Sequence, residues 1–187
     1  MIHMQLPTID RHWTLFLDRD GVINEEKIDD YIHRWEEFRF YEGALEAIRI
    51  FSGLFGHLFI VTNQRGVAKG VTRLEDLRVI HENMLREIEA AGGRIDRLYY
   101  CIDADPASPN RKPNPGMGLQ ARADFPDVDL SKSMMIGNTS GDMQFGRNLG
   151  VASNILIRTR KNVDPTGPDI DFSFDSLREA AGALAHR

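Results

Sequence analysis

The feature of this sequence that most constrains its fold is an alternation of short apolar runs with longer helical patterns. Five apolar runs have the length and composition of strands, and they span 13–18, 58–62, 97–101, 133–137 and 154–158. Residues with helical spacing predict helices over about 43–53, 73–91, 116–124, 141–149 and 175–185. Strands that alternate with helices are typical of a parallel sheet, and near-continuous apolar runs indicate strands covered on both faces. We therefore predict an α/β fold, a three-layer α/β/α sandwich around a mainly parallel, Rossmannoid sheet.

Size and charge narrow the class of protein further. The chain has 187 residues, a formal net charge of −5 and one cysteine, which fits a single domain over residues 1–187. One cysteine excludes an internal disulfide and favours a reducing compartment, so we expect a cytoplasmic protein. The acidic balance argues against nucleic acid as a partner, and the apolar runs are far shorter than the roughly 20 residues of a membrane span.

Polar residues gather where three of the predicted strands end. The segment 18–21 follows the first strand, 62–64 follows the second, and 137–138 ends the fourth. In open parallel sheets the ligand crevice lies outside the carboxyl ends of the strands. These three clusters therefore predict one site at a common edge of the sheet.

The first cluster holds two carboxylates. Asp18 and Asp20 are two positions apart, so in an extended chain their side chains project to the same side. Close carboxylates repel each other unless a cation or a shared proton holds them together. Gly21 permits the tight turn that follows. Taken alone, this pattern also fits a turn with solvated acids.

The other clusters supply groups that suit a phosphoryl ligand. Thr62 and Asn63 donate hydrogen bonds without adding charge, Lys112 is a good partner for a phosphate or an aspartate nucleophile, and Arg111 can fork onto a second anionic group. The segment 137–142 adds the amide of an asparagine and the carboxylate of an aspartate at the end of a buried strand. Each cluster by itself also fits an ordinary polar loop.

Together and in this order, four segments of the chain resemble the motifs of the haloacid dehalogenase-like (HAD) phosphatase superfamily, subfamily IIIA. The segments are 16–24, 61–64, 111–117 and 135–142, and the resemblance extends over about residues 13–160. The segments 30–33 and 38–40 narrow it to the D,D-heptose 1,7-bisphosphate phosphatases, with histidinol-phosphate phosphatases as close relatives. The resemblance implies a HAD-like fold, and the chain length leaves no room for a large cap.

The resemblance also implies a role for each motif residue. Asp18 would be the nucleophile, and Asp20 would act as general acid and then as general base. The other implied residues are Thr62 and Lys112 in catalysis, Asn63, Gln64, Arg111 and Arg19 at the substrate, and Asp18, Asp20, Asn138 and Asp142 at Mg²⁺. Asp20 would offer its backbone carbonyl to the metal.

The activity that the resemblance implies is Mg²⁺-dependent hydrolysis of a small phosphorylated metabolite. D-glycero-D-manno-heptose 1,7-bisphosphate, cleaved at the 7-phosphate, is the favoured substrate, and histidinol phosphate or another small sugar phosphate is the alternative. A polynucleotide 3′-phosphatase is disfavoured because the chain has no basic stripe. A two-component receiver domain is disfavoured because its phosphorylated aspartate belongs to a middle strand, whereas Asp18 ends the first predicted strand. We expect a monomer or a weak homodimer.

Two positions depart from the family pattern. Asn138 stands where the family usually has aspartate, and since an amide brings no charge, we expect weaker metal binding than in relatives. This opens a rival hypothesis, a phosphate-ester binding protein that has lost turnover. The segment 101–110 contains one cysteine and no histidine, so it cannot supply the four ligands of the zinc loop found in heptose bisphosphate phosphatases. We predict no zinc, and we expect Cys101 to be a small buried residue.

Overall fold

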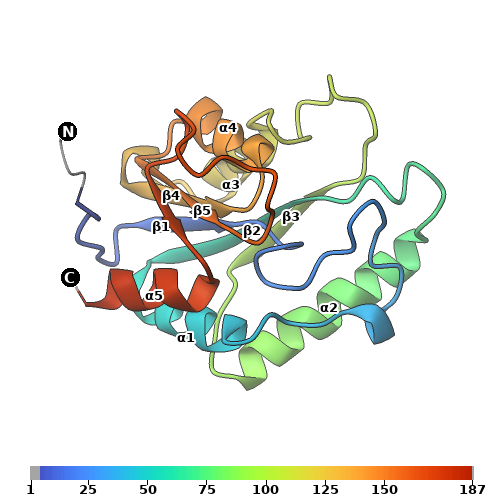
Figure 1. The fold of residues 1–187 in the computed structure, drawn as a ribbon, viewed down its shortest axis with the longest axis horizontal. Helices are drawn as coiled ribbons and strands as arrows, with labels where there is room; N and C mark the ends of the chain where they lie inside the picture. The colour runs from blue at the N-terminus through green and yellow to red at the C-terminus, as the bar shows by residue number, and fades with distance from the viewer. Residues whose placement is uncertain (1–4, 187) are drawn as a thin grey trace.

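The computed structural model describes residues 5–186, and its central feature is a six-stranded sheet. Its strands are β1 (Thr14–Leu17), β2 (His57–Asn63), β3 (Arg97–Cys101), β4 (Ser133–Gly137), β5 (Ser153–Ile157) and β6 (Phe172–Phe174). They lie in the order β3-β2-β1-β4-β5-β6, and every neighbouring pair is parallel. The carboxyl ends of the strands therefore meet at one edge of the sheet (Figure 1).

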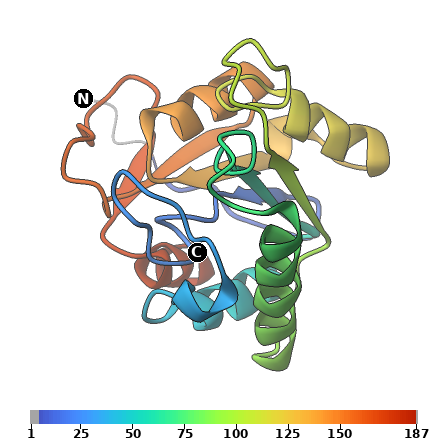
Figure 2. The ribbon, with the colours of Figure 1, turned by 90° about the vertical axis from the view of Figure 1, so that its right-hand side faces the viewer.

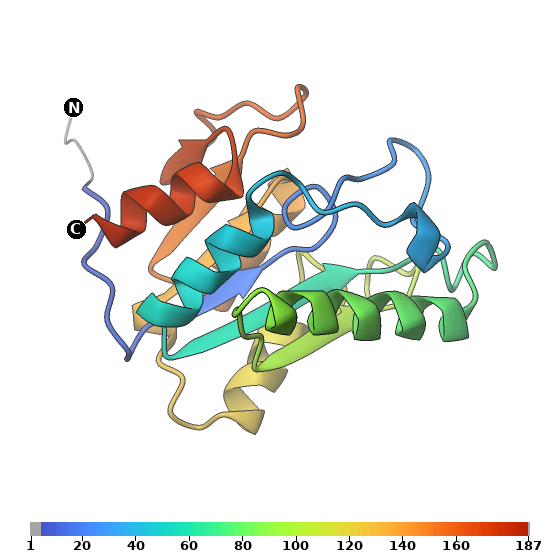
Figure 3. The ribbon, with the colours of Figure 1, turned by 90° about the horizontal axis from the view of Figure 1, so that it is seen from below.

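Helices cover both faces of this sheet. They are α1 (Ala44–Leu54), α2 (Leu74–Ala90), α3 (Gly116–Asp124), α4 (Ser140–Leu149) and α5 (Leu177–Ala185), with short 3₁₀ turns η1 (Trp35–Glu37) and η2 (Leu130–Lys132). Helices α1, α2 and α5 lie on one face (Figure 3), and α3 and α4 lie on the other (Figure 2). The predicted three-layer α/β/α sandwich with a parallel sheet is confirmed.

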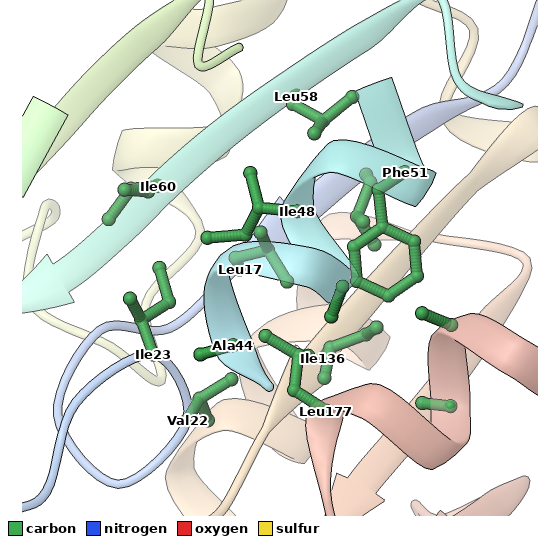
Figure 4. Close-up of a cluster of buried hydrophobic side chains, with 14 of the residues drawn as sticks. Leu17, Val22, Ile23, Ala44, Ile48, Phe51, Leu58, Ile60, Ile136 and Leu177 are labelled. Carbon is green, nitrogen blue, oxygen red and sulfur yellow. The ribbon is translucent and has the colours of Figure 1, made fainter. Parts of the chain in front are cut away.

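Alternate residues of the central strand explain the two layers of core. Leu15 and Leu17 belong to the cluster that packs against α1 and α5, together with Phe51 (Figure 4). Phe16, between them, belongs to the opposite cluster, where its ring centroid lies 5.6 Å from that of Phe59. All four residues of β1 are buried, because a strand in the middle of a doubly covered sheet meets helices on both sides.

The observed elements match the predicted ones closely, with one addition. The five predicted strands and five predicted helices are present, and their ends differ from the predictions by at most two residues. Helix α5 begins at Leu177 rather than 175 because the Ser176 side chain caps it by accepting a hydrogen bond from Glu179 N. Strand β6 was not predicted, because its three half-buried residues at the sheet edge form no apolar run.

Nothing resembling a large cap is inserted in the described chain. Between β1 and α1 the structure contains only η1 and irregular segments, and between β2 and β3 it contains α2 and the loops beside it. The carboxyl edge of the sheet is therefore covered only by loops, and those after β1 and β2 emerge at the same end (Figure 3). No helix among residues 5–186 combines the length and apolar character needed to cross a bilayer.

Candidate active site

A cavity of about 960 Å³ lies at the carboxyl edge of the sheet. The predicted site residues that line it are Asp18, Asp20, Thr62, Asn63, Gln64, Arg111, Lys112, Asn138 and Asp142. They lie at or just after the ends of β1, β2 and β4, with Asp142 in the first turn of α4. The loop between β3 and α3 contributes Arg111 and Lys112. The parallel topology thus brings together motifs that are far apart in the sequence.

Lys112 joins two buried carboxylates in the centre of the site. Its Nζ donates hydrogen bonds to Asp18 Oδ1 at 2.8 Å and to Asp142 Oδ1 at 2.5 Å. The three side chains are only 4%, 10% and 3% exposed, respectively. The second oxygen of Asp18, Oδ2, has no hydrogen-bond partner among the described residues. Asp18 therefore keeps one carboxylate oxygen available to a ligand in the cavity.

Burial and mutual charge set the protonation of this cluster. Burial and the neighbouring Asp142 raise the pKa of Asp18 to about 7, although Lys112 opposes the shift. Burial alone would lower the pKa of Lys112, but the carboxylates of Asp142 and Asp18 outweigh it and raise that pKa. Lys112 therefore remains an ammonium, and a cation beside Asp18 would favour its ionised form.

Asp20 is held by hydrogen bonds to both of its oxygens. Oδ1 accepts from Arg19 at 2.7 Å and from Asn24 Nδ2 at 2.9 Å, and Oδ2 accepts from Gln64 Nε2 at 2.8 Å. Burial would raise the pKa of Asp20, but the Arg19 charge and these hydrogen bonds hold it below its ordinary value. Asp20 is thus a carboxylate in this state, which suits a proton acceptor, and it remains 27% exposed to the cavity.

Arg19 does not face the cavity, in contrast to the predicted contact with substrate. It is fully buried, and its guanidinium lies between Asp20 and His81, whose Nε2 is 3.0 Å from Arg19 Nη1. Burial and the Arg19 charge lower the pKa of His81 to about 3, so the imidazole stays neutral and accepts from the guanidinium. The structure therefore places Arg19 where it orients Asp20 rather than where a substrate would lie.

Residues at the end of β2 form hydrogen bonds to the loop that carries Lys112 and to neighbouring site residues. Asn63 Nδ2 donates to Lys112 O and Asn63 Oδ1 accepts from Lys112 N, both at 3.0 Å. This amide pair fixes the backbone of Lys112 against the end of β2. Gln64 Nε2 also donates to Thr62 Oγ1 at 2.9 Å, so Gln64 links Thr62 to Asp20. Arg111 lines the cavity, and its guanidinium bonds the carbonyl of Ala104.

The start of α4 positions Asn138 and Asp142. Thr139 and Asp142 form a capping box in which each side chain accepts from the other residue's backbone N–H. Asp142 Oδ2 also accepts from Asn138 N at 3.2 Å. Asn138 is fully buried, and its Nδ2 donates to Glu26 Oε1 at 2.9 Å and to Thr159 Oγ1 at 3.1 Å. Its Oδ1 is buried and has no hydrogen-bond partner.

The oxygen atoms present at this site fit a magnesium ion. Among residues 5–186 no three His, Cys, Asp or Glu side chains are grouped to hold a metal by themselves, so a cation here would also need amide or backbone oxygens. The unpaired Asn138 Oδ1 and the free Asp18 Oδ2 are such oxygens, and hard cations like Mg²⁺ prefer oxygen ligands. Magnesium characteristically keeps several waters and few protein ligands, which suits this sparse set.

Four residues around the site were not found from the sequence. His81 contacts Arg19, Glu26 and Thr159 contact Asn138, and Arg160 pairs with Glu26. His81 belongs to α2, where its spacing is that of a core residue, and no local pattern marks its contact with Arg19. Cys101, by contrast, is buried as expected, at 3% exposure.

Comparisons with known proteins agree with this geometry. A family described as HAD-hydrolase-like matches residues 109–180. The chain is 33% identical over 175 residues to a D-glycero-alpha-D-manno-heptose-1,7-bisphosphate 7-phosphatase of Mycobacterium tuberculosis, covering 93% of this chain and 92% of that protein. It is 39% identical over 165 residues to the enzyme of the same name in Campylobacter jejuni, covering 88% and 91%.

Solved structures show the same likeness. The crystal structure of a D,D-heptose 1,7-bisphosphate phosphatase from B. bronchiseptica, complexed with magnesium and phosphate, is similar with a TM-score of 0.83 and 27% identity. That likeness covers 93% of this chain and 98% of the other.

Proposed function

Since this chain belongs to the haloacid dehalogenase-like phosphatases, we propose that it removes the 7-phosphate of D-glycero-D-manno-heptose 1,7-bisphosphate through an aspartyl-phosphate on Asp18. The observation that carries the proposal is the Lys112 ammonium between Asp18 and Asp142, all three of which line the cavity. It leaves Asp18 Oδ2 free for attack and offsets charge where an anionic group would arrive. The names of the relatives supply the substrate.

In the first step the free oxygen of Asp18 attacks phosphorus and the bond from phosphorus to the sugar oxygen breaks. Asp20 gives a proton to the leaving sugar oxygen. Asp20 is ionised in the unliganded site, so it must gain that proton with the substrate, whose phosphoryl charge raises the pKa of a neighbouring carboxyl. General acid catalysis of this kind contributes roughly 10²–10⁴-fold in rate.

In the second step water attacks the phosphoryl group and the bond from phosphorus to Asp18 breaks, releasing phosphate. Asp20, now a carboxylate, takes the proton of that water. Its hydrogen bonds from Arg19, Asn24 and Gln64 hold it in place in both steps. Thr62 and Asn63 line the cavity beside Lys112, and we expect Thr62 to contact the phosphoryl oxygens and Asn63 to hold the Lys112 backbone against them.

Magnesium would be held by Asp18, Asn138 and the backbone carbonyl of Asp20, with Asp142 beside them. When bound, it would neutralise charge on the transferring phosphoryl group. We propose that zinc has no part in the protein, because the segment 101–110 contains a single cysteine and no histidine. Elemental analysis of the purified protein tests this, and stoichiometric zinc would contradict it.

The cavity also has the charge needed for a second phosphate. Arg65, Lys69 and Lys161 line it, and none of the three has an acidic partner within 4.0 Å among residues 5–186. Lys69 Nζ lies 5.4 Å from the ring centroid of Tyr31, which also lines the cavity. These cations support a bisphosphate substrate over a monophosphate such as histidinol phosphate.

The test is release of phosphate from a panel of esters with Mg²⁺, comparing the wild type with Asp18→Asn. We expect the highest kcat/KM for heptose 1,7-bisphosphate and no turnover by the variant. A higher kcat/KM for histidinol phosphate would change the substrate and leave the mechanism in place. Binding of these esters without turnover at saturating Mg²⁺ would instead support a phosphate-ester binding protein.

We further propose that the protein acts in the cytoplasm as a monomer or weak homodimer, without nucleic acid as a partner. The single cysteine supports a reducing compartment, and the net charge of −5 argues against nucleic acid as a partner. Light scattering at several concentrations measures the oligomeric state.

A further inference from the structure

The side-chain amide of Asn138 has an orientation that its neighbours impose. Glu26 carries a carboxylate, which can only accept a hydrogen bond. The Thr159 hydroxyl donates its proton to Gly21 O at 2.7 Å, so toward Asn138 it also acts as an acceptor. Both groups therefore require the NH₂ of Asn138, at 2.9 and 3.1 Å. The amide oxygen must point away from them.

That oxygen is left without a partner. Asn138 Oδ1 is buried and accepts no hydrogen bond from the described residues. A buried acceptor without a partner is unfavourable, and such groups commonly mark a site for an ion or a water. Asn138 lines the same cavity as Asp18 and Asp142, so a cation there would satisfy this oxygen.

Glu26 is itself fixed in place. Arg160 Nε donates to its Oε1 at 2.7 Å, a second guanidinium nitrogen bonds Oε2, and the Glu26 side chain is only 11% exposed. Gly21, at φ +84°, lies directly against the Asn138 amide and the Glu26 carboxylate, and a β-carbon there would collide with that amide. The Glu26 and Asn138 contact is therefore built into the turn that also carries Asp20.

We propose that Glu26 is a positioning residue that turns the Asn138 amide oxygen toward the magnesium ion. The proposal rests on the proposed function in that the cation is the one used in that reaction. Glu26 acts through Asn138 and does not touch the reacting atoms. The contact fixes the direction of a neutral ligand at position 138, because Glu26 and Thr159 hold its NH₂ group from behind.

The same geometry makes aspartate unsuitable at this position. A carboxylate at 138 would place an oxygen about 3 Å from Glu26 Oε1, where the present contact measures 2.9 Å, and the two like-charged groups would repel each other. A carboxylate is ordinarily a better ligand for a divalent cation than an amide. Asn138→Asp should therefore help metal binding only when Glu26 is neutral.

The experiment is a double-mutant cycle on cation affinity, using Mn²⁺ as the probe and electron paramagnetic resonance to measure free Mn²⁺. The variants are Asn138→Asp, Glu26→Gln and the two together. We expect Asn138→Asp to improve Mn²⁺ affinity at least about tenfold more in the Glu26→Gln background than in the wild type. Equal effects of Asn138→Asp in both backgrounds would overturn the proposal.

Removal of the acceptors tests the orientation itself. Glu26→Ala should weaken Mn²⁺ binding about 10- to 100-fold, as loss of a group behind a metal ligand commonly does. Glu26→Gln retains an acceptor oxygen, so its Mn²⁺ affinity should be closer to that of the wild type. Thr159→Val removes the second acceptor and should also weaken binding. Unchanged Mn²⁺ affinity in both Glu26→Ala and Thr159→Val would overturn the proposal.

Glu25→Gln is the matched control, because it removes the same charge from the adjacent, exposed residue. We expect it to leave Mn²⁺ affinity unchanged, and an effect equal to that of Glu26→Ala would mean that general charge, not the contact, is responsible. Circular dichroism confirms that each variant is folded. Because the readout is binding and not turnover, failure of the phosphatase assay would leave this cycle interpretable.

Discussion

The neutral histidine behind Arg19 should make the stability of this protein depend on pH. His81 is buried, and it faces the Arg19 guanidinium, the Asp20 carboxylate beyond it and the ring of Tyr100. Burial and the Arg19 charge lower its pKa from 6.5 to about 3 in the folded state. An unfolded chain takes up a proton at this residue near pH 6.5, whereas the folded chain does not.

The sign and size of the effect follow from proton linkage. Between pH 6.5 and 3 the unfolded state binds more protons at His81, so the free energy of unfolding falls as pH falls through that window. With these two pKa values, lowering the pH from 7 to 5 removes about 2 kcal/mol through this residue alone. Other groups titrate as well, so only a comparison with a variant isolates the contribution.

The variant is His81→Gln, whose amide oxygen still accepts from Arg19 and does not titrate. Urea unfolding at pH 7 and pH 5 gives the free energy of unfolding for both proteins. We expect the wild type to lose about 2 kcal/mol more than the variant over this range. Losses that agree within about 0.5 kcal/mol would show that His81 does titrate in the folded protein, and the reasoning would be wrong.

Two further changes test the site. Lys112→Met leaves the Asp18 and Asp142 carboxylates buried without a cation, so we expect the free energy of unfolding in urea to fall by about 3–5 kcal/mol. Mg²⁺ should restore part of this stability, and a fall below about 1 kcal/mol would contradict the ion-pair geometry. Gly21 has φ +84°, and Gly21→Ala forces a β-carbon onto the Asn138 amide. We expect about 1–3 kcal/mol of destabilisation and weaker Mn²⁺ binding. An unaltered Mn²⁺ binding isotherm would contradict the close approach of Gly21 to Asn138.

The sheet could be predicted from the sequence because its strands are continuous apolar runs separated by helical patterns. Strand β6 was missed because it lacks such an apolar run. Strand β6 has three residues, each half-buried, and it joins the sheet only through its pairing with β5. A strand that short carries no periodicity, so its existence depends on the neighbour it pairs with.

The site could be predicted where a motif holds the residues together, and not where contacts join distant segments. Asp18 and Asp20 are two positions apart, and their place at the end of β1 marks them. The partners of Arg19 and Asn138 lie 62 and 112 positions away along the chain, at His81 and Glu26. Arg19, next to two motif acids, was expected to contact substrate, because the buried histidine that turns its guanidinium inward leaves no local sign.

The position of β1 in the sheet has a consequence for synthesis of the chain. Its first neighbour, β2, follows within about 40 residues, whereas its second neighbour, β4, begins at Ser133. In a nascent chain that has left the ribosome only as far as β3, strand β1 therefore has one unpaired edge, although all its residues are buried in the finished sheet. Unpaired strand edges of this kind promote association between chains. Such a chain already contains Asp18 but lacks both Lys112 and Asp142. The middle of the sheet closes late in synthesis, and the last carboxylate of the site arrives with it.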